Sequence, residues 1–242
     1  MMKFSKIYEP RISEYAKDGK LALESIIRIL EDAGSKHSAS VNDDIIESGL
    51  KGVSWILVEW NVEIHSFPDN KEKLYVDTWA VCKKAELITQ REFEIKDKNG
   101  NVYVNACERL VLEDFNAGKL IKITPEMMTD YKPEESLHYG FDFSKIKEPV
   151  EYDLEKNLAV RITDIDFNNH VHNTYYLDYA LEAIEEYEKQ SVSGFRILYK
   201  KPIMYKDEAI VKSVNNREDY TVGIYKQDML CTLVQIKKSQ EF

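Results

Sequence analysis

The hydrophobic and polar positions of the chain follow two periods, one helical and one typical of strands. In residues 20–34, KLALESIIRILEDAG, apolar side chains such as Ile26 and Ile29 fall on one helical face. Gly34 stands where a helix commonly ends, and a polar stretch follows to about residue 51. From residue 55 onward, apolar and polar side chains alternate, which is the period of a half-buried strand. The pattern therefore predicts one helix followed by several strands.

The predicted strands of the first half form a continuous series of alternating segments. Asn99-Gly100 lies between two of them, and this dipeptide favours the tight turn of a β-hairpin. Residues 129–150 contain proline and glycine without a clear period, which predicts a linker. The predicted strands cover residues 55–67, 73–83 and 87–114, and the series closes near residues 120–128.

The same order of elements recurs after the predicted linker. Residues 174–189 have helical periodicity, and Asn173 stands in the position of an N-cap. One helix followed by several strands, twice over, indicates an internal duplication. Each half has one helix, too few to cover both faces of its sheet, which favours two α+β layers joined as a pseudo-dimer. The strands predicted in the second half are residues 194–205, 207–214, 219–226 and 229–238.

Composition and charge exclude several classes of protein. The chain has 242 residues, of which 43% are hydrophobic and 31% charged, a globular composition. A formal net charge of −10 argues against non-specific nucleic-acid binding. Cys82, Cys107 and Cys231 form no CxxC pair, which favours free thiols in a reducing compartment. No apolar run is long enough to span a membrane and the first residues lack the h-region of a signal peptide, so we expect a cytoplasmic protein.

Polar and titratable side chains gather in residues 163–174, TDIDFNNHVHNT, directly before the second predicted helix. Asp166, Asn168 and His170 are spaced i, i+2, i+4. In an extended segment this spacing puts all three side chains on one side. The start of a helix immediately afterwards supplies unpaired backbone N–H groups and the positive end of the helix dipole.

This stretch resembles the signature of acyl-ACP thioesterases, in which an Asp-x-Asn-x-His-Val-x-Asn block leads into the second helix of a double hotdog fold. Residues 55–81, with Val76-Asp77-Thr78-Trp79, are similar to a strand pair of that family, and KLIKITPEMM at 119–128 is similar to the close of its first hotdog. The similarity covers about residues 3–214. It implies an α+β tandem (double) hotdog, in which each half is an antiparallel sheet wrapped around one long helix. The implied domains are an N-terminal hotdog at 1–128, a linker at 129–150 and a C-terminal hotdog at 151–242.

The resemblance implies that Asp166, Asn168 and His170 are catalytic. Thioester hydrolysis needs an activated water or nucleophile and donors for the developing oxyanion. We expect Asp166 to orient or activate the attacking species, Asn168 to position water or the carbonyl, and His170 to transfer a proton or stabilise charge. Asn173 could cap the helix or polarise the thioester, and the sequence does not choose between these roles. We expect no cofactor and no metal.

One departure from the family changes the expected mechanism. In plant members, a strand of the second hotdog carries Tyr, two basic residues and then Glu-Cys, whereas residues 199–203 read Tyr-Lys-Lys-Pro-Ile. Both the Glu, at Pro202, and the Cys are missing, so a cysteine nucleophile is not expected. A basic-Pro-apolar strand is similar to simpler hotdog acyl-CoA thioesterases, in which one Asp before the helix carries much of the catalysis. We therefore expect Asp166, more than a full set of catalytic residues, to account for catalysis.

Simpler interpretations stand beside these. Asp164 and Asp166 could be helix-capping acids, worth about 1 kcal/mol, and we expect Asp164 to be structural. His170 and His172 could bind a metal with Asp166, although no further ligand cluster is evident. Glu182, inside the second predicted helix, resembles the helical Glu that some hotdog enzymes use, but we expect it to be a solvated or capping acid. The three tryptophans could pack the first sheet or line an acyl tunnel.

The implied partner is acyl carrier protein, whose acidity conflicts with a net charge of −10 unless a basic patch steers the encounter. The alternatives are an acyl-CoA thioesterase using Asp166 and a non-catalytic acyl-binding hotdog module. We expect one active site per chain, with the first half shaping the acyl pocket, in a monomer or a homodimer. The candidate basic residues are Lys200, Lys201 and Lys206, or Lys83 and Lys84.

Overall fold

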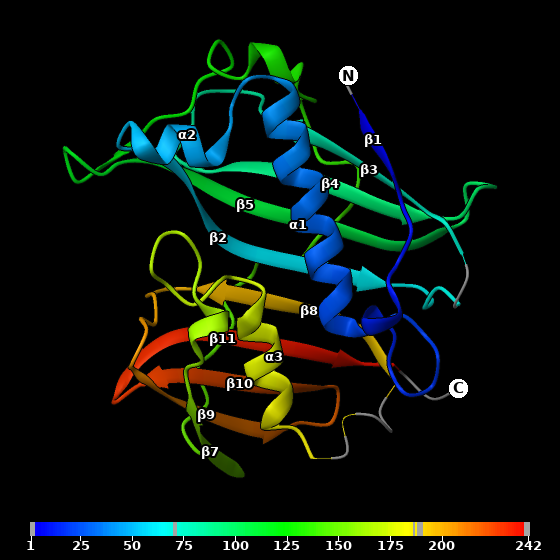
Figure 1. The fold of residues 1–242 in the computed structure, drawn as a ribbon, viewed down its shortest axis with the longest axis vertical. Helices are drawn as coiled ribbons and strands as arrows, with labels where there is room; N and C mark the ends of the chain where they lie inside the picture. Colours follow the sequence, from blue (N-terminus) through cyan, green and yellow to red (C-terminus); the bar gives the residue numbers. More distant parts are fainter. Residues whose placement is uncertain (1–2, 70–71, 186, 188–190, 240–242) are drawn as a thin grey trace. The chain divides into compact units, whose positions relative to one another are not determined.

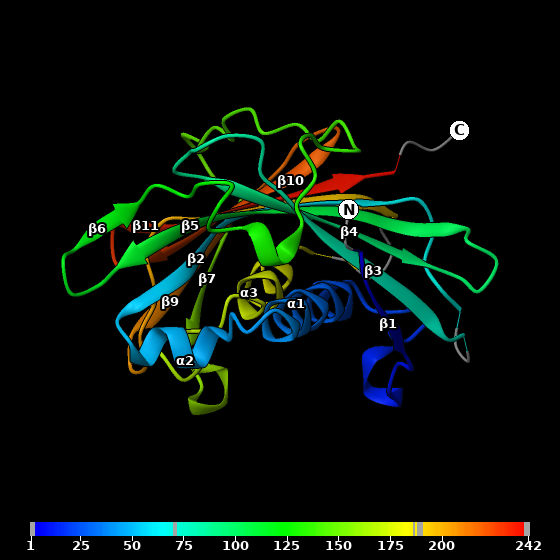
Figure 2. The same ribbon diagram turned by 90° about the horizontal axis from the view of Figure 1, so that it is seen from above.

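The computed structural model describes residues 3–69, 72–185, 187 and 191–239. It divides into two compact units. Unit 1 comprises residues 1–58 and 62–142, and unit 2 comprises residues 59–61 and 143–242. Each unit is an antiparallel sheet with a helix along one face (Figures 1 and 2). The predicted domain boundaries remain predictions.

Unit 1 has its strands in the order β1-β3-β4-β5-β2, with the short strand β6 paired to β5. The helix α1 lies along one face of this sheet (Figure 2). The hairpin predicted at Asn99-Gly100 is confirmed, because it joins β4 to β5 and Gly100 has a φ of 90°. The elements are β1 (Phe4–Tyr8), α1 (Leu23–Ser40), α2 (Ile45–Leu50), β2 (Val53–Ile64), β3 (Leu74–Val81), β4 (Thr89–Lys96), β5 (Val102–Asp114) and β6 (Lys119–Ile121), with 3-10 turns at Ile12–Glu14 and Thr129–Tyr131.

The predicted end of the first helix at Gly34 is wrong, because α1 continues through Gly34 to Ser40. At Gly34 the helix approaches the sheet closely. A Cβ at this position would lie 3.3 Å from Nη1 of Arg91 and 3.4 Å from the ring of Phe93. The polar stretch that follows also contains a second short helix, α2.

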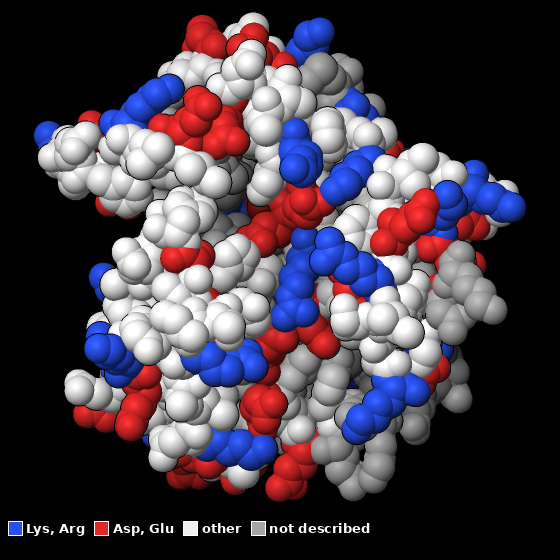
Figure 3. Space-filling view, in the orientation of Figure 1, with Lys and Arg blue, Asp and Glu red and all other residues white. Residues whose placement is uncertain are grey.

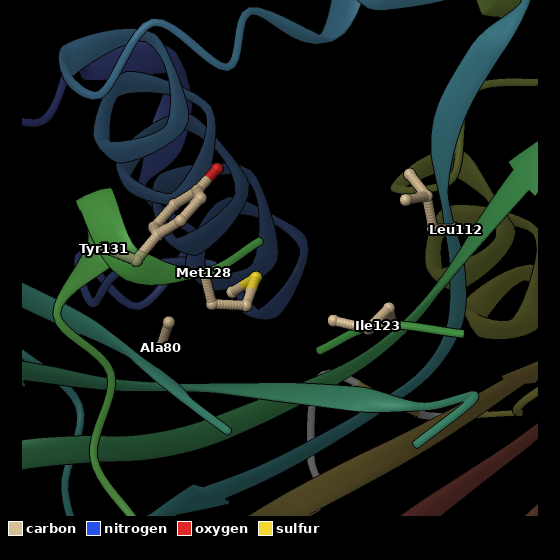
Figure 4. Close-up of a cluster of buried hydrophobic side chains, with 5 residues drawn as sticks. All are labelled: Ala80, Leu112, Ile123, Met128 and Tyr131. Atoms are coloured by element: carbon tan, nitrogen blue, oxygen red, sulfur yellow. The ribbon is translucent and has the colours of Figure 1, made fainter. Parts of the chain in front are cut away.

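The residues after β6 pack back onto unit 1. Met128 and Tyr131 lie against α1 in a buried cluster with Ala80, Leu112 and Ile123 (Figure 4). The Tyr131 hydroxyl donates to Ser38 Oγ of α1 at 2.9 Å. Further along, the buried carboxylate of Glu92 accepts the backbone N–H groups of His138 and Tyr139. The first part of the predicted linker therefore belongs structurally to unit 1.

Unit 2 has its strands in the order β8-β11-β10-β9-β7, and α3 packs against β9, β10 and β11. The strand predicted at 194–205 ends at Tyr199, and the helix predicted at 174–189 ends at Glu182. Residues 186 and 188–190 of that predicted helix lie outside the described residues. The elements are β7 (Leu154–Ala159), α3 (Tyr175–Glu182), β8 (Val192–Tyr199), β9 (Glu208–Asn215), β10 (Asp219–Lys226) and β11 (Met229–Lys238), with a 3-10 turn at Ile162–Asp164.

Candidate active site

The three predicted catalytic residues lie on a tight hairpin, residues 165–171, which we call the Asp166 hairpin. Its ends pair through Ile165 and Val171, and the Asp166 N–H donates to the His170 carbonyl at 2.8 Å. Asn169, at the turn, has a φ of 61°, a left-handed conformation that asparagine tolerates better than most residues. The expectation of an extended segment with three side chains on one side is therefore wrong.

The Asp166 carboxylate also bonds to the main chain of this turn. Its Oδ1 accepts the backbone N–H of Asn168 at 2.8 Å and that of His170 at 3.2 Å. Aspartate commonly stabilises turns in this way. Asp166 and His170 thus stand opposite each other at the base of the hairpin, half-buried, whereas Asn168 is exposed near its tip. The hairpin brings Asp166 and His170 together and sets Asn168 apart.

One oxygen of Asp166 is left for chemistry. Oδ1 is engaged by the main chain, while Oδ2 has no hydrogen-bond partner among the described residues. A half-buried carboxylate with one free oxygen can accept a proton from water or hold a water by a hydrogen bond.

Asp164 anchors the hairpin and is fully buried. Its carboxylate accepts hydrogen bonds from Arg161 Nε at 3.0 Å and from the Tyr179 hydroxyl of α3 at 2.7 Å. Burial alone would raise the pKa of this carboxyl, but the hydrogen bonds from Arg161 and Tyr179 outweigh burial and hold the pKa below its ordinary value. Asp164 therefore ties the hairpin to α3 and does not cap that helix.

The start of α3 follows directly. Thr174 is the N-cap residue and makes no side-chain cap hydrogen bond, so the prediction of Asn173 as N-cap is wrong. The Tyr199 hydroxyl holds this turn by donating to the Asn173 carbonyl at 2.9 Å. In the described part of the chain, the backbone N–H groups of Asn173 and Thr174 have no acceptor. Unpaired N–H groups at the start of a helix can stabilise an oxyanion.

A loop beside the hairpin carries the predicted basic residues. Residues 200–207 follow β8, and Ile203 accepts the Val171 N–H on its carbonyl at 2.8 Å. His170 pairs with Met204 of the same loop. Pro202 is exposed. Three exposed lysines stand on this loop, namely Lys200, Lys201 and Lys206.

Unit 1 contains the same hairpin without the site residues. Over the hairpin and the start of the helix that follows it, residue n of unit 1 corresponds to residue n + 150 of unit 2. The Ala16 N–H donates to the Lys20 carbonyl at 2.8 Å, and the Gly19 N–H donates to the Ala16 carbonyl at 2.9 Å. Tyr15 pairs with Leu21, as Ile165 pairs with Val171. Ala16 occupies the position of Asp166, so this main-chain fold forms without that carboxylate.

A pocket of about 590 Å³ opens over the unit 1 hairpin. Tyr15, Ala16 and Gly19 contribute to its wall, together with Glu9 and Lys73, which form an ion pair at 2.6 Å. Because Ala16 stands where unit 2 has Asp166, this pocket does not offer the chemistry predicted for the second half.

Other candidate groups fit a structural role. Burial raises the pKa of the Cys107 and Cys231 thiols, as it does for the half-buried Cys82, so none is an activated thiolate. Glu182 is exposed at the end of α3. The described ranges hold no group of three or more His, Cys, Asp or Glu side chains arranged to bind a metal. They also hold no helix of the length and apolarity needed to span a membrane.

The two helix-bearing antiparallel sheets, with an acid-bearing hairpin before the second helix, define a tandem hotdog protein. The chain belongs to the acyl-ACP thioesterase family, because the family model of the N-terminal domain matches residues 1–131 and that of the C-terminal domain matches residues 147–239.

Curated relatives agree with this family. The chain is 23% identical over 206 residues to the chloroplastic oleoyl-acyl carrier protein thioesterase 1 of Arabidopsis thaliana, covering 76% of this chain and 56% of the relative. It is 22% identical over 213 residues to the chloroplastic dodecanoyl-[acyl-carrier-protein] hydrolase of Cinnamomum camphora, covering 82% of this chain and 56% of that protein. The chain thus spans about half the length of the curated relatives it matches.

Solved structures confirm the predicted fold. An acyl-ACP thioesterase from Bacteroides thetaiotaomicron has a TM-score of 0.86 at 20% identity, with 98% of each chain covered. A 12:0-ACP thioesterase from Umbellularia californica has a TM-score of 0.84 at 17% identity, covering 99% of this chain and 98% of that chain. At these identities the similarity concerns the fold alone.

Residues that support the hairpin were not found from the sequence. Arg161 and Tyr179 bond Asp164 directly before the hairpin. Tyr176 bonds the adjacent loop, and Tyr199 bonds the entry of α3. A sequence signal did exist, because Arg-Ile-Ser-Glu at 11–14 and Arg-Ile-Thr-Asp at 161–164 are related by the same offset of 150. Aligning the two halves on these tetrapeptides would have drawn attention to the turn that follows each.

Proposed function

We propose that the protein is an acyl-ACP thioesterase, which hydrolyses the thioester of acyl-acyl carrier protein to a free fatty acid and holo-ACP. One observation carries the proposal. Two hairpins share their main-chain hydrogen bonds, and Asp166 in unit 2 replaces Ala16 in unit 1. Because the hairpin folds without the carboxylate, the half-buried Asp166 with its free Oδ2 is best explained by chemistry.

In the proposed reaction, Oδ2 of Asp166 orients a water molecule and takes its proton as the water oxygen attacks the thioester carbonyl carbon. The carbonyl oxygen becomes an oxyanion, which the N–H groups of Asn173 and Thr174 stabilise at the entry of α3. The carbon–sulfur bond then breaks, His170 gives a proton to the departing thiolate, and His170 regains a proton from Asp166, which restores both groups. Asn168 positions the water or the carbonyl, and the Asn173 side chain has a positioning role.

Asp166 replaces the strand glutamate that plant members carry. Its backbone hydrogen bonds to Asn168 and His170 fix the carboxylate in one orientation. A preorganised group loses little entropy in reaching the geometry of the transition state. A single oriented carboxylate can therefore activate water without a second acid at Pro202.

The carrier is proposed to approach from the loop of residues 200–207. Lys200, Lys201 and Lys206 are exposed there, next to the Asp166 hairpin. Acidic and basic side chains are interspersed over the face shown in Figure 3, so steering by a local group of lysines is compatible with a net charge of −10. We propose a cytoplasmic role in fatty acid biosynthesis, as a monomer or homodimer.

The test is thiol release from short- to long-chain acyl-ACPs and the matching acyl-CoAs, with the Asp166→Ala variant run alongside. Removing a general base costs roughly 10²- to 10⁴-fold in rate, so we expect turnover on acyl-ACP to fall by at least about 100-fold in this variant. The matched control is Asp18→Ala, which removes the turn carboxylate of the unit 1 hairpin, where Asp18 Oδ1 accepts the Lys20 N–H at 3.0 Å. Both variants should keep the wild-type circular dichroism spectrum.

Each other outcome has a defined meaning. Retained turnover in Asp166→Ala would exclude Asp166 as the base. A clear preference for acyl-CoA would favour the rival acyl-CoA thioesterase. No turnover on either carrier would favour a non-catalytic acyl-binding module.

A further inference from the structure

We infer that Tyr176 is a positioning residue of the proposed active site, acting through the main chain of Ile203. This inference rests on the proposed function. Tyr176 lies in the first turn of α3 and is 2% exposed. Its hydroxyl accepts the backbone N–H of Ile203 at 3.0 Å.

The peptide groups of Ile203 connect Tyr176 to the Asp166 hairpin. While the N–H of Ile203 donates to Tyr176, its carbonyl accepts the N–H of Val171 at 2.8 Å. Val171 follows His170 directly, and His170 pairs with Met204. Ile203 therefore holds the hairpin at Val171, and Tyr176 of α3 holds Ile203.

A second side chain restrains the same loop. The Met204 N–H donates to Oδ2 of Asp207 at 2.8 Å, and Asp207 forms an ion pair with Lys226 of β10 at 2.8 Å. Two consecutive backbone N–H groups of the loop are therefore held by side chains. The N–H of Ile203 is held by Tyr176 of α3, and that of Met204 is held by Asp207 at the end of the loop. Such restraint is what a site that must hold its groups within a fraction of an ångström requires.

Unit 1 lacks both partners of the Tyr176–Ile203 hydrogen bond. Ile26 stands 150 positions before Tyr176 and has no hydroxyl. The residue that accepts the Leu21 N–H, as Ile203 accepts that of Val171, is Pro68, which has no N–H to donate. The contact there is also longer, 3.3 Å against 2.8 Å.

The comparison of Tyr176 with Ile26 distinguishes a functional role of the hydroxyl from a role in folding. A buried isoleucine fills the same position in the unit 1 helix, so core packing does not require a phenol. Donor and acceptor occur together in the unit with Asp166 and His170, and both are missing in the unit without them. The hydrogen bond therefore serves the site.

The test is Tyr176→Phe, which removes the hydroxyl and keeps the ring that packs edge-on against Tyr199 with centroids 5.6 Å apart. Displacement of catalytic groups by about 1 Å can cost about 100-fold in rate, so we expect kcat to fall by roughly ten- to a hundredfold with KM changed less than about twofold. The second readout is amide hydrogen exchange at Val171 by NMR. The Val171 N–H donates to the Ile203 carbonyl and not to the lost hydroxyl, so an increase of about tenfold would report transmission through Ile203.

The control is Tyr225→Phe in the same unit, whose hydroxyl bonds Tyr152 and Glu148, each at 2.7 Å, away from the hairpin. It should leave both kcat and the Val171 exchange rate unchanged. An unchanged kcat in Tyr176→Phe, a fall in kcat without faster Val171 exchange, or an equal effect in the control would each overturn the inference.

Failure of the proposed function can be distinguished from failure of the inference about Tyr176. A wild-type protein without turnover would refute the thioesterase proposal. The Val171 exchange rate would then still decide whether Tyr176 fixes the hairpin.

Discussion

Two buried titratable groups in unit 1 should give opposing dependences of stability on pH, which cancel in the wild type. His37 of α1 is fully buried, stacks on Phe4 and meets Tyr131 edge-on. Neither of its ring nitrogens has a hydrogen-bond partner among the described residues. Glu108 of β5 is buried with its carboxylate 3.2 Å from Arg91 Nε on β4. Burial, together with the charge of Arg91, lowers the pKa of His37 from 6.5 to about 4, while burial raises the pKa of Glu108 from 4.5 to about 7 against the attraction of Arg91.

The signs follow from which state binds more protons. Between pH 6.5 and about 4, His37 is protonated in the unfolded chain but neutral in the folded one, so the free energy of unfolding falls as the pH drops. Between about pH 7 and 4.5, Glu108 is protonated in the folded chain but ionised in the unfolded one, so the free energy of unfolding rises as the pH drops. Each pKa change is worth about 3 kcal/mol, and the two windows overlap.

Single variants should reveal each slope. His37→Phe keeps an aromatic ring between Phe4 and Tyr131 and leaves Glu108 to act alone. Its unfolding free energy should rise by about 3 kcal/mol between roughly pH 7 and pH 4.5. Glu108→Gln should show a fall of about 3 kcal/mol over roughly the same range, caused by His37. The measurement is urea unfolding followed by circular dichroism at several pH values.

The double variant provides the decisive control. With both groups removed, the pH dependence should return to that of the wild type, because the two contributions cancel. The reasoning would be refuted if both single variants gave curves parallel to the wild type. It would also be refuted if the two slopes had the same sign.

Two further predictions concern folding. Asp164→Ala should lower the free energy of unfolding by about 2–4 kcal/mol, because it leaves the Tyr179 hydroxyl buried without its acceptor. Arg161→Ala should lower the free energy of unfolding by at most about 1 kcal/mol, since that side chain is 63% exposed. Equal losses in urea unfolding would contradict this assignment. Gly34→Ala should destabilise by about 1–3 kcal/mol, because its Cβ would lie 3.3 Å from a buried guanidinium, whereas Gly49→Ala in α2, with nothing within 4 Å, should stabilise by about 0.5–1 kcal/mol. A gain in melting temperature for Gly34→Ala would show that the sheet yields to the added methyl.

Strand periodicity in the sequence predicted most of the sheet, since a strand with one buried face leaves a regular pattern. The strands predicted at 219–226 and 229–238 coincide with β10 and β11. The predictions failed where a contact with a residue distant in the sequence decides where a strand ends. β8 ends at Tyr199 because the N–H groups of both Lys200 and Lys201 turn to the single carbonyl of Cys231, at 2.9 and 3.1 Å. Nothing local in Lys-Lys-Pro indicates that partner.

The site residues were predicted through the family resemblance, but their geometry was not. The spacing of Asp166, Asn168 and His170 suggested an extended strand, whereas the aspartate followed by Asn168-Asn169 has the chemistry of a turn. The supporting tyrosines could not be predicted, because Tyr176 meets Ile203 27 positions away and Tyr179 meets Asp164 15 positions away. Helical periodicity marks such tyrosines only as core residues.

The position of the turn carboxylate distinguishes the two hairpins. In unit 1, Asp18 near the exposed tip accepts the N–H of Lys20, which stabilises the turn. In unit 2 the carboxylate is at the base, where Asp166 accepts the N–H of His170, and Asn168 takes the place of Asp18. If the carboxylate served only the turn, the exposed tip would suffice, because a solvated charge avoids the cost of desolvation. Placing it half-buried opposite His170 incurs that cost, which supports the proposal that Asp166 has a role beyond the turn.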